Sequence, residues 1–391
     1  MARVCIIRQY HYPLDPRVRR EAAALELLGH EVDVICLRGS CERPRERRGR
    51  ITVYRLPLTH RRGGPLRYLF EYAAFMLGAA LVATALQLRR HYRLIQVNTM
   101  PDALVFAALG PRLLGARVLL DLHECMPEFF ATKFGLGNRH AATLAVVLAE
   151  QASIRFADAA ITCTDQMRDA FIARGARPEK VRVVLNASDE SLFDPRRCPS
   201  TARGTGPMRL ICHGSVEPLY GLDTVISALA LLRSESLDVT LQIFGEGSAL
   251  DELEALAARL GVGAVVYFSR TFVPIEELVE AIGAADAGVV AMRRDAFRDL
   301  VHCNKMFDFI AMGKPVICSR TRSAEAYFDE GCFRFFTAGD ERDLARAIRD
   351  LHCEPELGER MVRRTAEVSE RYRWKHQRGA YQALATALLE P

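Results

Sequence analysis

The chain has 391 residues, half of them hydrophobic and 26% charged, with a formal net charge of +5. This length exceeds one hydrophobic core and fits two domains, and the modest charge predicts no nucleic-acid partner. The 11 cysteines include no CxxC pair, which argues against a disulfide framework and a zinc site and favours a reducing compartment. The opening sequence MARVCIIRQYHYP has too short an apolar run for a signal peptide, so we expect a cytoplasmic protein.

The first half alternates short apolar strands with helical segments, the pattern of a doubly wound parallel sheet. We expect strands at residues 4–8, 31–37, 52–56, 94–98, 117–121, 159–164 and 181–185. Helices are expected at 16–28, 66–90, 102–114, 141–156 and 165–173. These elements define an N-terminal domain, residues 1–189.

Within the second of these helices, residues 72–88 are almost wholly apolar (YAAFMLGAALVATALQL). The run is short for a membrane span, which needs about 18–20 apolar residues. A helix buried across the sheet is the interpretation we favour. Contact with an anionic membrane surface through His60-Arg61-Arg62 and Arg67, and a true span, are the alternatives.

The same alternation begins again after residue 207. Strands are expected at 209–213, 239–244, 265–269, 287–291 and 316–318, with helices at 222–233, 248–260, 275–284 and from Asn304 onward. Segment 190–207 is rich in Pro, Gly and Ser and is the expected linker. A second domain, 208–373, and a terminal segment, 374–391, with a helix at 377–389, complete the chain. Because ligands bind at the carboxyl ends of strands in such sheets, we expect the chemistry in a cleft between two facing domains.

Two glycine-rich turns follow strands of the second half. Gly214 permits a tight turn, and Gly221 precedes a helix, so backbone amides near Gly221 can approach a phosphate. The second turn, Gly245-Glu246-Gly247, lacks the third glycine of a dinucleotide fingerprint, and there is no Walker A lysine. A nicotinamide-dependent or ATP-hydrolysing enzyme is therefore not expected.

Residues 304–319, NKMFDFIAMGKPVICS, combine an amphipathic helix with a buried strand. Lys305 and Asp308 lie three residues apart on one helical face, and Gly313 and Pro315 end the helix. A carboxylate can accept hydrogen bonds from ribose hydroxyls, while an ammonium and a helix N-terminus suit phosphates. The segment is therefore typical of a nucleotide site, with an ordinary ion pair on a surface helix as the alternative.

Five segments of the chain occur in an order found in one enzyme family. They are DPRVRREAAALELLGHEVDVICLR, DLHECMPEFFATKFG, HGSVEPLYGLDTVISAL, FGEGSALDELEALAARLGV and NKMFDFIAMGKPVI. They resemble, in this order, an opening βαβ unit, the loop with the active-site histidine, a glycine-bounded diphosphate loop, a GxG strand–helix unit and the helix bearing the second acidic residue of an E-x7-E motif. The family is the retaining glycosyltransferases of family 4, with the GT-B fold, and the resemblance is to a bacterial polysaccharide-type branch.

The resemblance implies roles for individual residues. His123, Lys305 and Asp308 are the implied catalytic residues, with Asp308 on the ribose and Lys305 on phosphate. The implied donor site consists of Gly214, Ser215, Tyr220, Gly221, Gly245, Glu246, Arg270, Asn304 and Met306. The implied acceptor side consists of Tyr10, His11, Arg17, Glu124 and Glu128.

The chain also departs from the family pattern at several of these positions. Leu300 occupies the place of the first glutamate of the E-x7-E motif, and Asp308 that of the second. Ser215 and Tyr220 stand where Arg and Lys are common in the diphosphate loop. The leaving nucleoside diphosphate still needs charge compensation, which we expect from Lys305 with Arg293, Arg294 or Arg298.

For several residues in the first half of the chain, a purely structural role is the alternative to a role in the site. His123 follows a strand and faces the expected cleft, but a capping or core histidine would occupy the same position. Glu124 and Glu128 are either acceptor-side carboxylates or solvated surface residues. For Arg17 a solvated helix start is favoured over an acceptor phosphate contact, because Asp15-Pro16 is a good N-cap with proline in the first turn.

The sequence thus predicts a metal-independent retaining glycosyltransferase without a cofactor. Its donor would be a UDP- or GDP-linked sugar, and its acceptor a glycan or a lipid-linked glycan at the inner membrane face. A sugar-nucleotide epimerase or phosphorylase of the same fold and a non-catalytic nucleotide-sugar-binding partner are the alternatives.

Overall fold

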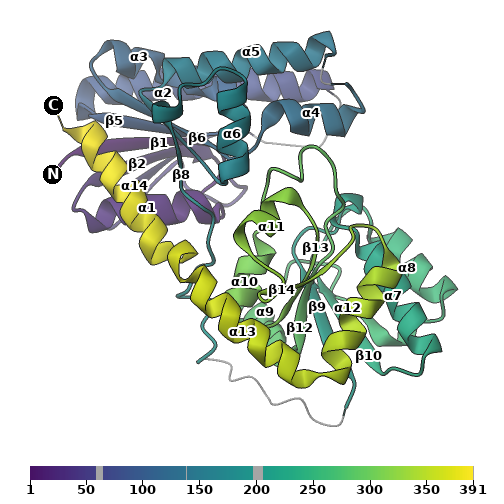
Figure 1. Ribbon diagram of the computed structural model, residues 1–391. Coiled ribbons are helices and arrows are strands. Elements are labelled where there is room, and N and C mark those ends of the chain that lie inside the picture. The colour runs from purple at the N-terminus through teal and green to yellow at the C-terminus, as the bar shows by residue number, and fades with distance from the viewer. Residues whose placement is uncertain (59–64, 138, 197–205, 391) are drawn as a thin grey trace. The chain divides into compact units, whose positions relative to one another are not determined.

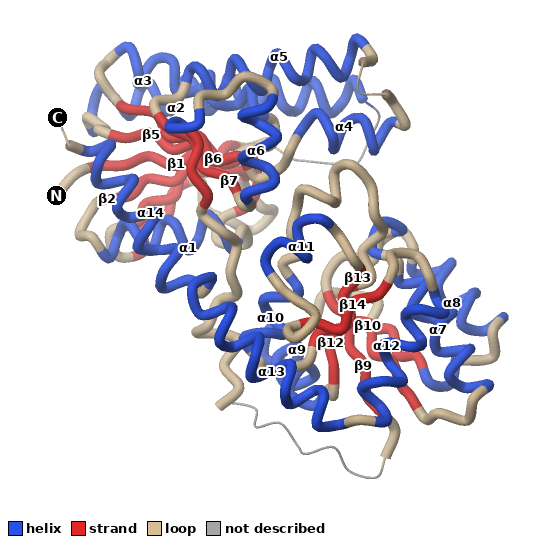
Figure 2. The backbone as a smooth tube through the Cα atoms, viewed as in Figure 1, coloured by secondary structure: helices blue, strands red, loops and turns tan. Residues whose placement is uncertain are grey.

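The computed structural model describes residues 1–391 except 59–64, 138, 197–205 and 391 (Figure 1). The chain divides into two compact units, which consist of residues 1–186 with 375–391 and of residues 187–374. Each unit is an α/β domain around one sheet with helices against it (Figure 2). Half of the predicted linker 190–207, residues 197–205, falls outside the described ranges, and its described parts belong to the second unit.

The first unit contains an eight-stranded sheet in the order β3-β4-β2-β1-β5-β6-β7-β8. All neighbours are parallel except the edge pair β3–β4. The strands are β1 (Arg3–His11), β2 (Glu31–Leu37), β3 (Arg45–Arg48), β4 (Ile51–Leu56), β5 (Leu94–Asn98), β6 (Arg117–Leu122), β7 (Ala159–Thr162) and β8 (Val181–Val183). The strand order reverses between β1 and β5, and ligands of such sheets bind at the carboxyl ends beside this point.

Helices cover the two faces of this sheet unequally. Figure 1 shows α2, α3 and α5 together on one face and α1 with the terminal helix α14 on the other. The elements are α1 (Pro16–Leu27), α2 (Pro65–Arg90), the 3-10 helix η1 (Asp102–Ala108), α3 (Leu109–Leu113), α4 (Met126–Phe134), α5 (Ala141–Phe156), α6 (Asp165–Ala173), η2 (Pro178–Lys180) and α14 (Trp374–Leu389).

The second unit has a six-stranded, all-parallel sheet in the order β11-β10-β9-β12-β13-β14, which reverses between β9 and β12. Its strands are β9 (Met208–His213), β10 (Val239–Phe244), β11 (Val266–Phe268), β12 (Ala287–Val290), β13 (Val316–Ser319) and β14 (Phe333–Phe336). Its helices are η3 (Pro218–Tyr220), α7 (Leu222–Ser234), α8 (Leu250–Arg259), η4 (Gly263–Val265), α9 (Ile275–Ala284), α10 (Lys305–Ala311), α11 (Arg322–Tyr327), α12 (Glu341–Cys353), α13 (Pro355–Ser369) and η5 (Glu370–Tyr372).

Every strand and helix predicted from the sequence is present, with ends that shift by a few residues. The predicted helix 102–114 is divided into η1 and α3. The sequence reading did not include β3, α4, α11, β14, α12 and α13. The strand β3 has the sequence RERR, so it gives no apolar signal, and it pairs only at the antiparallel edge of the sheet.

The favoured interpretation of the apolar helix was wrong. Only 17% of the apolar window Leu69–Arg90 of α2 is buried, although the helix is long and apolar enough to cross a membrane. One stripe, which consists of Phe75, Ala79, Ala83 and Gln87, is buried in the unit. The basic residues His60, Arg61 and Arg62 lie outside the described residues.

A close contact between the backbone of β12 and an aromatic ring of α10 holds α10 against its sheet. A Cβ on Gly288 of β12 would lie 2.3 Å from ring atoms of Phe309, which is fully buried in α10. Gly288→Ala should therefore displace α10 and lower the free energy of unfolding by about 1–3 kcal/mol, the usual cost of overpacking. Gly379→Ala in α14, where a Cβ meets nothing within 4 Å, is the control in urea denaturation. Equal stability of the two variants would contradict this contact.

Candidate functional site

The two glycine-rich turns of the second unit lie against each other. The N–H of Gly214 donates to Phe244 O at 2.8 Å, and that of Val216 donates to Glu246 O at 2.9 Å. Gly245 has φ +146°, and a Cβ there would lie 1.9 Å from Gly214 O. A Cβ on Gly247 would likewise lie 2.1 Å from Val216 O. The turns therefore hold each other in place, and only glycine permits their approach.

The loop that starts at Gly214 leads into the N-terminus of α7. Gly221 has φ +61° and is the N-cap residue of α7, and no side chain forms a capping hydrogen bond there. A Cβ on Gly221 would lie 2.1 Å from Ala291 O, so the loop also lies against the end of β12. The first N–H groups of an uncapped helix, with the positive end of its dipole, are suited to an anion such as a phosphate.

The side chain of Lys305 lies over this loop. Its Nζ is 3.4 Å from Ser215 O and 3.7 Å from the ring centroid of Tyr220. A Cβ on Gly214 would lie 2.6 Å from Lys305 Cε, so Gly214 also makes room for the lysine. Burial lowers the pKa of Lys305 from its ordinary value. No carboxylate among the described residues pairs with its ammonium, which therefore remains available to a phosphate.

Asp308 lies one helical turn after Lys305 and is held from outside its helix. The Ser188 hydroxyl donates to Asp308 Oδ1 at 2.7 Å, and Asp308 Oδ2 lies 3.7 Å from His213 Nε2. Burial, with the charge of Lys305, lowers the pKa of His213 to about 3, so its ring is neutral at pH 7. Its Nε2 is buried and has no hydrogen-bond partner among the described residues. A ligand hydroxyl between His213 and Asp308 would satisfy both groups.

The sequence reading did not assign a role to His213. The available signal was its position at the carboxyl end of β9, directly before Gly214. His213 is 7% exposed, and its ring packs edge-on against Phe309 at 5.2 Å between centroids. The histidine thus belongs to the core as well as to the site.

Of the three arginines expected to help Lys305, only Arg293 reaches the loop. Arg293 Nε donates to Pro218 O at 3.3 Å, and its guanidinium also pairs with Asp223. Arg294 pairs with Asp299 at 3.0 Å, and Arg298 pairs with Asp295, both within their own loop. Leu300 is buried and places no polar group at the position of the first glutamate.

The other predicted donor residues divide into two groups. Ser215, Glu246 and Asn304 are exposed, and Tyr220 is half-buried beside Lys305. The side chain of Met306 is in the core, since the residue is 1% exposed, and its role as a donor contact stays a prediction. Arg270, at φ +60°, pairs with Asp251 and Glu254 of α8 at 2.7 and 2.6 Å. Arg270 thus holds the turn after β11 against α8.

In the first unit His123 directly follows β6 and contacts a buried carboxylate. His123 Nε2 lies 3.1 Å from Asp121 Oδ2, and the ring is 13% exposed. Arg17 Nε and Nη2 donate to the two oxygens of Asp121 at 2.7 and 2.8 Å. Because Asp121 is the acceptor, Nε2 carries the proton and Nδ1 remains an acceptor.

Charges around this pair fix their protonation states. Burial raises the pKa of Asp121, but Arg17 and His123 outweigh it and hold that pKa below its usual value. Burial and the charge of Arg8 lower the pKa of His123, and Asp121 only partly opposes them. At pH 7 we therefore expect an ionised Asp121 and a neutral His123.

A buried hydrogen-bond chain connects this pair to the last helix. Asn98 Nδ2 donates to Asp121 Oδ2 at 2.7 Å and to Glu21 Oε2 at 2.9 Å. Gln96 Nε2 donates to the same Glu21 oxygen at 2.7 Å, and Tyr381 Oη of α14 donates to Gln96 Oε1 at 2.6 Å. Burial and the charge of Asp121 raise the pKa of Glu21 well above its ordinary value. The terminal helix thus helps to hold His123 in position.

The structure agrees with the predicted N-cap of α1 but not with the predicted exposure of Arg17. Asp15 caps α1 as expected and accepts from the N–H groups of Arg17 and Val18. The expected solvated helix start was wrong for Arg17, because its side chain is buried and also donates to Val184 O and Asn186 Oδ1. Tyr10 is 45% exposed, and its ring contacts that of His11.

Glu124 and Glu128 are not the solvated carboxylates of the alternative interpretation. Glu128 accepts from Arg174 Nη1 at 2.5 Å and its side chain is 18% exposed. Glu124 is half-buried, and burial, only partly opposed by Arg8, raises its pKa to about 7. No three His, Cys, Asp or Glu side chains gather as metal ligands in the described part of the chain.

The raised pKa of Glu124 predicts a defined pH dependence of stability. Between the ordinary carboxyl pKa of 4.5 and about 7, the unfolded chain releases this proton while the folded chain keeps it, so stability falls as pH rises. Glu124→Gln removes the group, and its free energy of unfolding relative to wild type should increase between pH 4.5 and 7 by on the order of 1–3 kcal/mol. Urea denaturation at pH 5 and pH 8 measures this. A constant difference would show that Glu124 titrates normally.

Two family models match the chain. Residues 14–187 match the glycosyl transferase 4-like domain, and residues 207–354 match the glycosyl transferases group 1 domain. A curated relative is the GDP-mannose-dependent alpha-(1-6)-phosphatidylinositol dimannoside mannosyltransferase of Mycobacterium tuberculosis. It is 27% identical over 368 residues, 92% of this chain and 87% of the relative. Three other curated relatives are covered over 57%, 39% and 52% of their length, so the chain spans about half of them.

Solved structures show the same fold. A sucrose-phosphate synthase from Thermosynechococcus elongatus matches with a TM-score of 0.80 at 19% identity, over 99% of both chains. The HepE protein of Anabaena, in complex with UDP-glucose, matches with a TM-score of 0.74 at 17% identity, over 99% of this chain and 100% of that one. The two family models together cover most of the chain, in the expected order and on the two units of the structure. The chain therefore belongs to the family-4 glycosyltransferases and has the two α/β domains of the GT-B fold.

Proposed function

We propose that the protein transfers a sugar from a UDP- or GDP-linked donor to a hydroxyl of a glycan or lipid-linked acceptor. The observation that carries the proposal is the pair of interlocked glycine turns beneath the ammonium of Lys305, which no carboxylate among the described residues neutralises. The uncapped N-terminus of α7 offers backbone N–H groups, and Lys305 adds one positive charge over the loop that leads into it, which suits a diphosphate. The names of the mannosyltransferase relative and of the UDP-glucose complex support a nucleotide-sugar donor.

In the proposed reaction the bond between the anomeric carbon and the β-phosphate oxygen breaks, and a bond to the acceptor oxygen forms. The nucleoside diphosphate leaves with the bonding electrons, and the acceptor proton moves to a leaving phosphate oxygen. Lys305 and the N-terminus of α7 stabilise the charge that develops on this phosphate. Retention of configuration and independence of metal ions are part of the proposal and rest on the family resemblance.

Three further side chains receive roles in this scheme. Asp308, oriented by Ser188, accepts hydrogen bonds from the ribose, and the buried Nε2 of His213 is satisfied by a donor hydroxyl. His123 presents Nδ1 as an acceptor for a hydroxyl of the donor sugar or of the acceptor, while Asp121 holds the opposite ring nitrogen. No nucleophilic side chain is needed in a front-face transfer.

The acceptor and the place of reaction are also proposals. A membrane glycolipid or lipid-linked glycan is supported by the phosphatidylinositol dimannoside in the relative's name. The ten cysteines in the described part of the chain are all free thiols, which supports a reducing compartment. We therefore place the reaction at the cytoplasmic face of a membrane.

Lys305→Met tests the donor site through turnover. The substitution removes a charge-assisted contact to the leaving phosphate, worth about 1.5–3 kcal/mol, so kcat/KM should fall roughly 10–150-fold. The assay measures release of UDP or GDP from a panel of their sugars, in the presence of a lipid-linked glycan acceptor and of EDTA. Lys375→Met, which removes the same charge from α14 of the other unit, is the control.

Other outcomes of this assay would contradict the proposal. Donor binding without transfer or hydrolysis would indicate a non-catalytic nucleotide-sugar-binding protein. Conversion of the donor sugar without any acceptor would indicate an epimerase, and sugar phosphate release with inorganic phosphate would indicate a phosphorylase. Unchanged kcat/KM in Lys305→Met would move the phosphate site elsewhere.

A further inference from the structure

The helix α2 presents one apolar face to the core and another to the outside. Phe75, Ala79, Ala83 and Gln87 are buried at four-residue intervals. On the opposite side Phe70, Leu77, Leu81 and Leu88 are 73%, 62%, 74% and 62% exposed. At about 100° per residue these four side chains fall within a sector of roughly 40°. Exposed apolar residues in such a row are unusual for a soluble surface and mark a contact site.

Neighbouring elements extend this face. The helix α2 packs beside η1 and α3, and η1 packs beside α5. The helices α2, α3 and α5 lie on the same side of the sheet (Figure 1). Each neighbour contributes large apolar side chains that are at least about a third exposed. They are Phe106 of η1, Leu109 and Leu113 of α3, and Leu144 and Leu148 of α5. We call the surface formed by α2, η1, α3 and α5 the apolar face.

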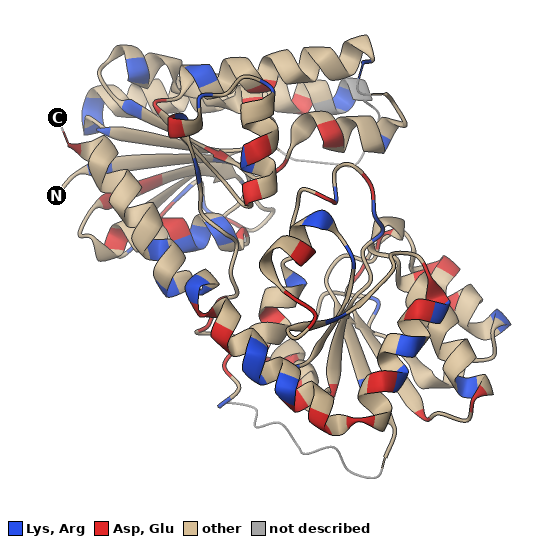
Figure 3. Cartoon of the chain, in the orientation of Figure 1, with Lys and Arg blue, Asp and Glu red and all other residues tan. Residues whose placement is uncertain are grey.

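The charges around the apolar face have one sign. Among the described residues 65–158, every acidic side chain is buried or half-buried, and Glu71 is held by Arg67 at 2.9 Å. Every exposed charge of Asp, Glu, Lys or Arg in this stretch is basic, and Figure 3 shows where Lys and Arg lie along the ribbon. The exposed basic residues are Arg67, Arg89, Arg93, Arg117, Lys133, Arg139 and Arg155.

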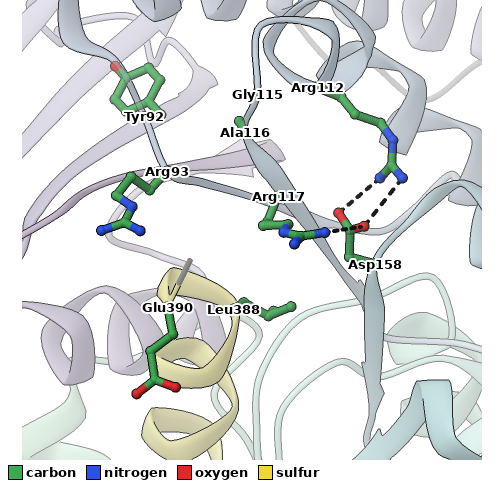
Figure 4. A pocket seen from close by; sticks show the side chains of 9 residues that line it. All are labelled: Tyr92, Arg93, Arg112, Gly115, Ala116, Arg117, Asp158, Leu388 and Glu390. Atoms are coloured by element: carbon green, nitrogen blue, oxygen red, sulfur yellow. Dashed lines mark hydrogen bonds and ion pairs between the residues drawn. The ribbon is translucent and has the colours of Figure 1, made fainter.

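Several of these arginines gather at one end of the apolar face. Each of the helices α2, α3 and α5 follows one parallel strand and precedes the next, so it runs from the edge where strands end to the edge where strands begin. The C-terminal ends of these helices, with Arg89, Arg112 and Arg155, therefore lie at the edge where the strands begin. There Arg93, Arg112 and Arg117 line a cavity of about 400 Å³ (Figure 4). Asp158 pairs with Arg112 at 2.9 Å and with Arg117 at 3.7 Å, and the exposed Glu390 also lines the cavity. Three arginines thus meet two carboxylates there, which leaves one net positive charge, and Arg93 has no side-chain partner among the described residues.

We propose that the apolar face docks on the surface of a bilayer that contains anionic lipids. The exposed row of α2 would enter the boundary between headgroups and acyl chains, and the arginines would contact lipid phosphates. In this position α2 lies in the plane of the membrane, because its other side belongs to the core of the first unit. A spanning α2 would leave that core and expose the sheet.

A second copy of the chain is the competing occupant of the apolar face. The excess of exposed basic residues opposes it, because two copies that meet through the same surface bring their arginines together. An anionic lipid surface instead matches both the apolar row and the basic rim. The proposal does not depend on glycosyl transfer, since binding to vesicles is measured without donor or turnover.

The test is co-sedimentation of the full chain with vesicles of phosphatidylcholine, with and without phosphatidylglycerol. We expect binding to the anionic vesicles that weakens as salt is added. The double variant Leu77→Gln/Leu81→Gln should lower the partition coefficient by at least about tenfold, since each leucine no longer buries apolar area. Leu27→Gln/Leu28→Gln, at the exposed end of α1 and its C-cap, is the matched control and should bind as wild type does.

The charge contribution is tested separately. Arg93→Gln/Arg117→Gln should lower binding to phosphatidylglycerol vesicles by about 25-fold, at roughly 1 kcal/mol for each arginine. Arg233→Gln/Arg259→Gln, which removes two exposed charges from α7 and α8 of the other unit, should have no such effect. Circular dichroism and nucleotide binding check that every variant is folded.

Three results would overturn the proposal. If the wild-type protein fails to bind anionic vesicles at low salt, the docking is excluded. If Leu77→Gln/Leu81→Gln binds the vesicles as tightly as wild type, the membrane contact lies elsewhere. If light scattering shows that wild type is a dimer and Leu77→Gln/Leu81→Gln a monomer, and the two bind vesicles equally, the apolar face is the contact surface for a second copy.

Discussion

The backbone around Gly214 and the backbone around Gly245 approach so closely that a methyl group does not fit between them. This contact fixes the positions of two turns that come from neighbouring parallel strands, β9 and β10. The loop that leads from Gly214 to the uncapped N-terminus of α7 therefore needs little reorganisation when an anion arrives, which is how preorganised sites gain strength. The residues Ser215 and Tyr220 stand where the family resemblance implies cations, and Lys305 places its ammonium over both.

In the first unit a network of buried polar side chains holds the neutral His123 at the end of a strand. Asp121 orients His123, and Arg17 keeps Asp121 ionised in the core. A buried charge of this kind is costly unless its partners are complete, and the chain from Asn98 to Tyr381 completes them. Part of the site in the first unit thus depends on the last helix of the chain.

The sequence predicted the two-domain α/β architecture, because apolar strands alternate with helices and each strand ends in a loop with glycine or polar residues. It also predicted glycine turns at Gly214, Gly221 and Gly245, which follow from local geometry, while the roles of these glycines and of Lys305 in donor binding stay predictions. What it missed depends on tertiary context. Burial decides that Met306 belongs to the core, and long-range pairing converts Arg17 from an expected surface residue into a partner of Asp121. The exposure of α2 is of the same kind, since composition does not say which side of a helix has a partner.

The interlocked turns and Lys305 are proposed to form a diphosphate site, on which donor binding and transfer depend. Calorimetric titration with UDP, UMP, GDP and GMP, without metal, tests it most directly. We predict that wild type binds one diphosphate at least about tenfold more tightly than its monophosphate, which corresponds to about 1.4 kcal/mol for the second phosphate. We also predict that Lys305→Met loses this preference. Equal affinity of wild type for the two, or a preference that survives in Lys305→Met, would contradict the account.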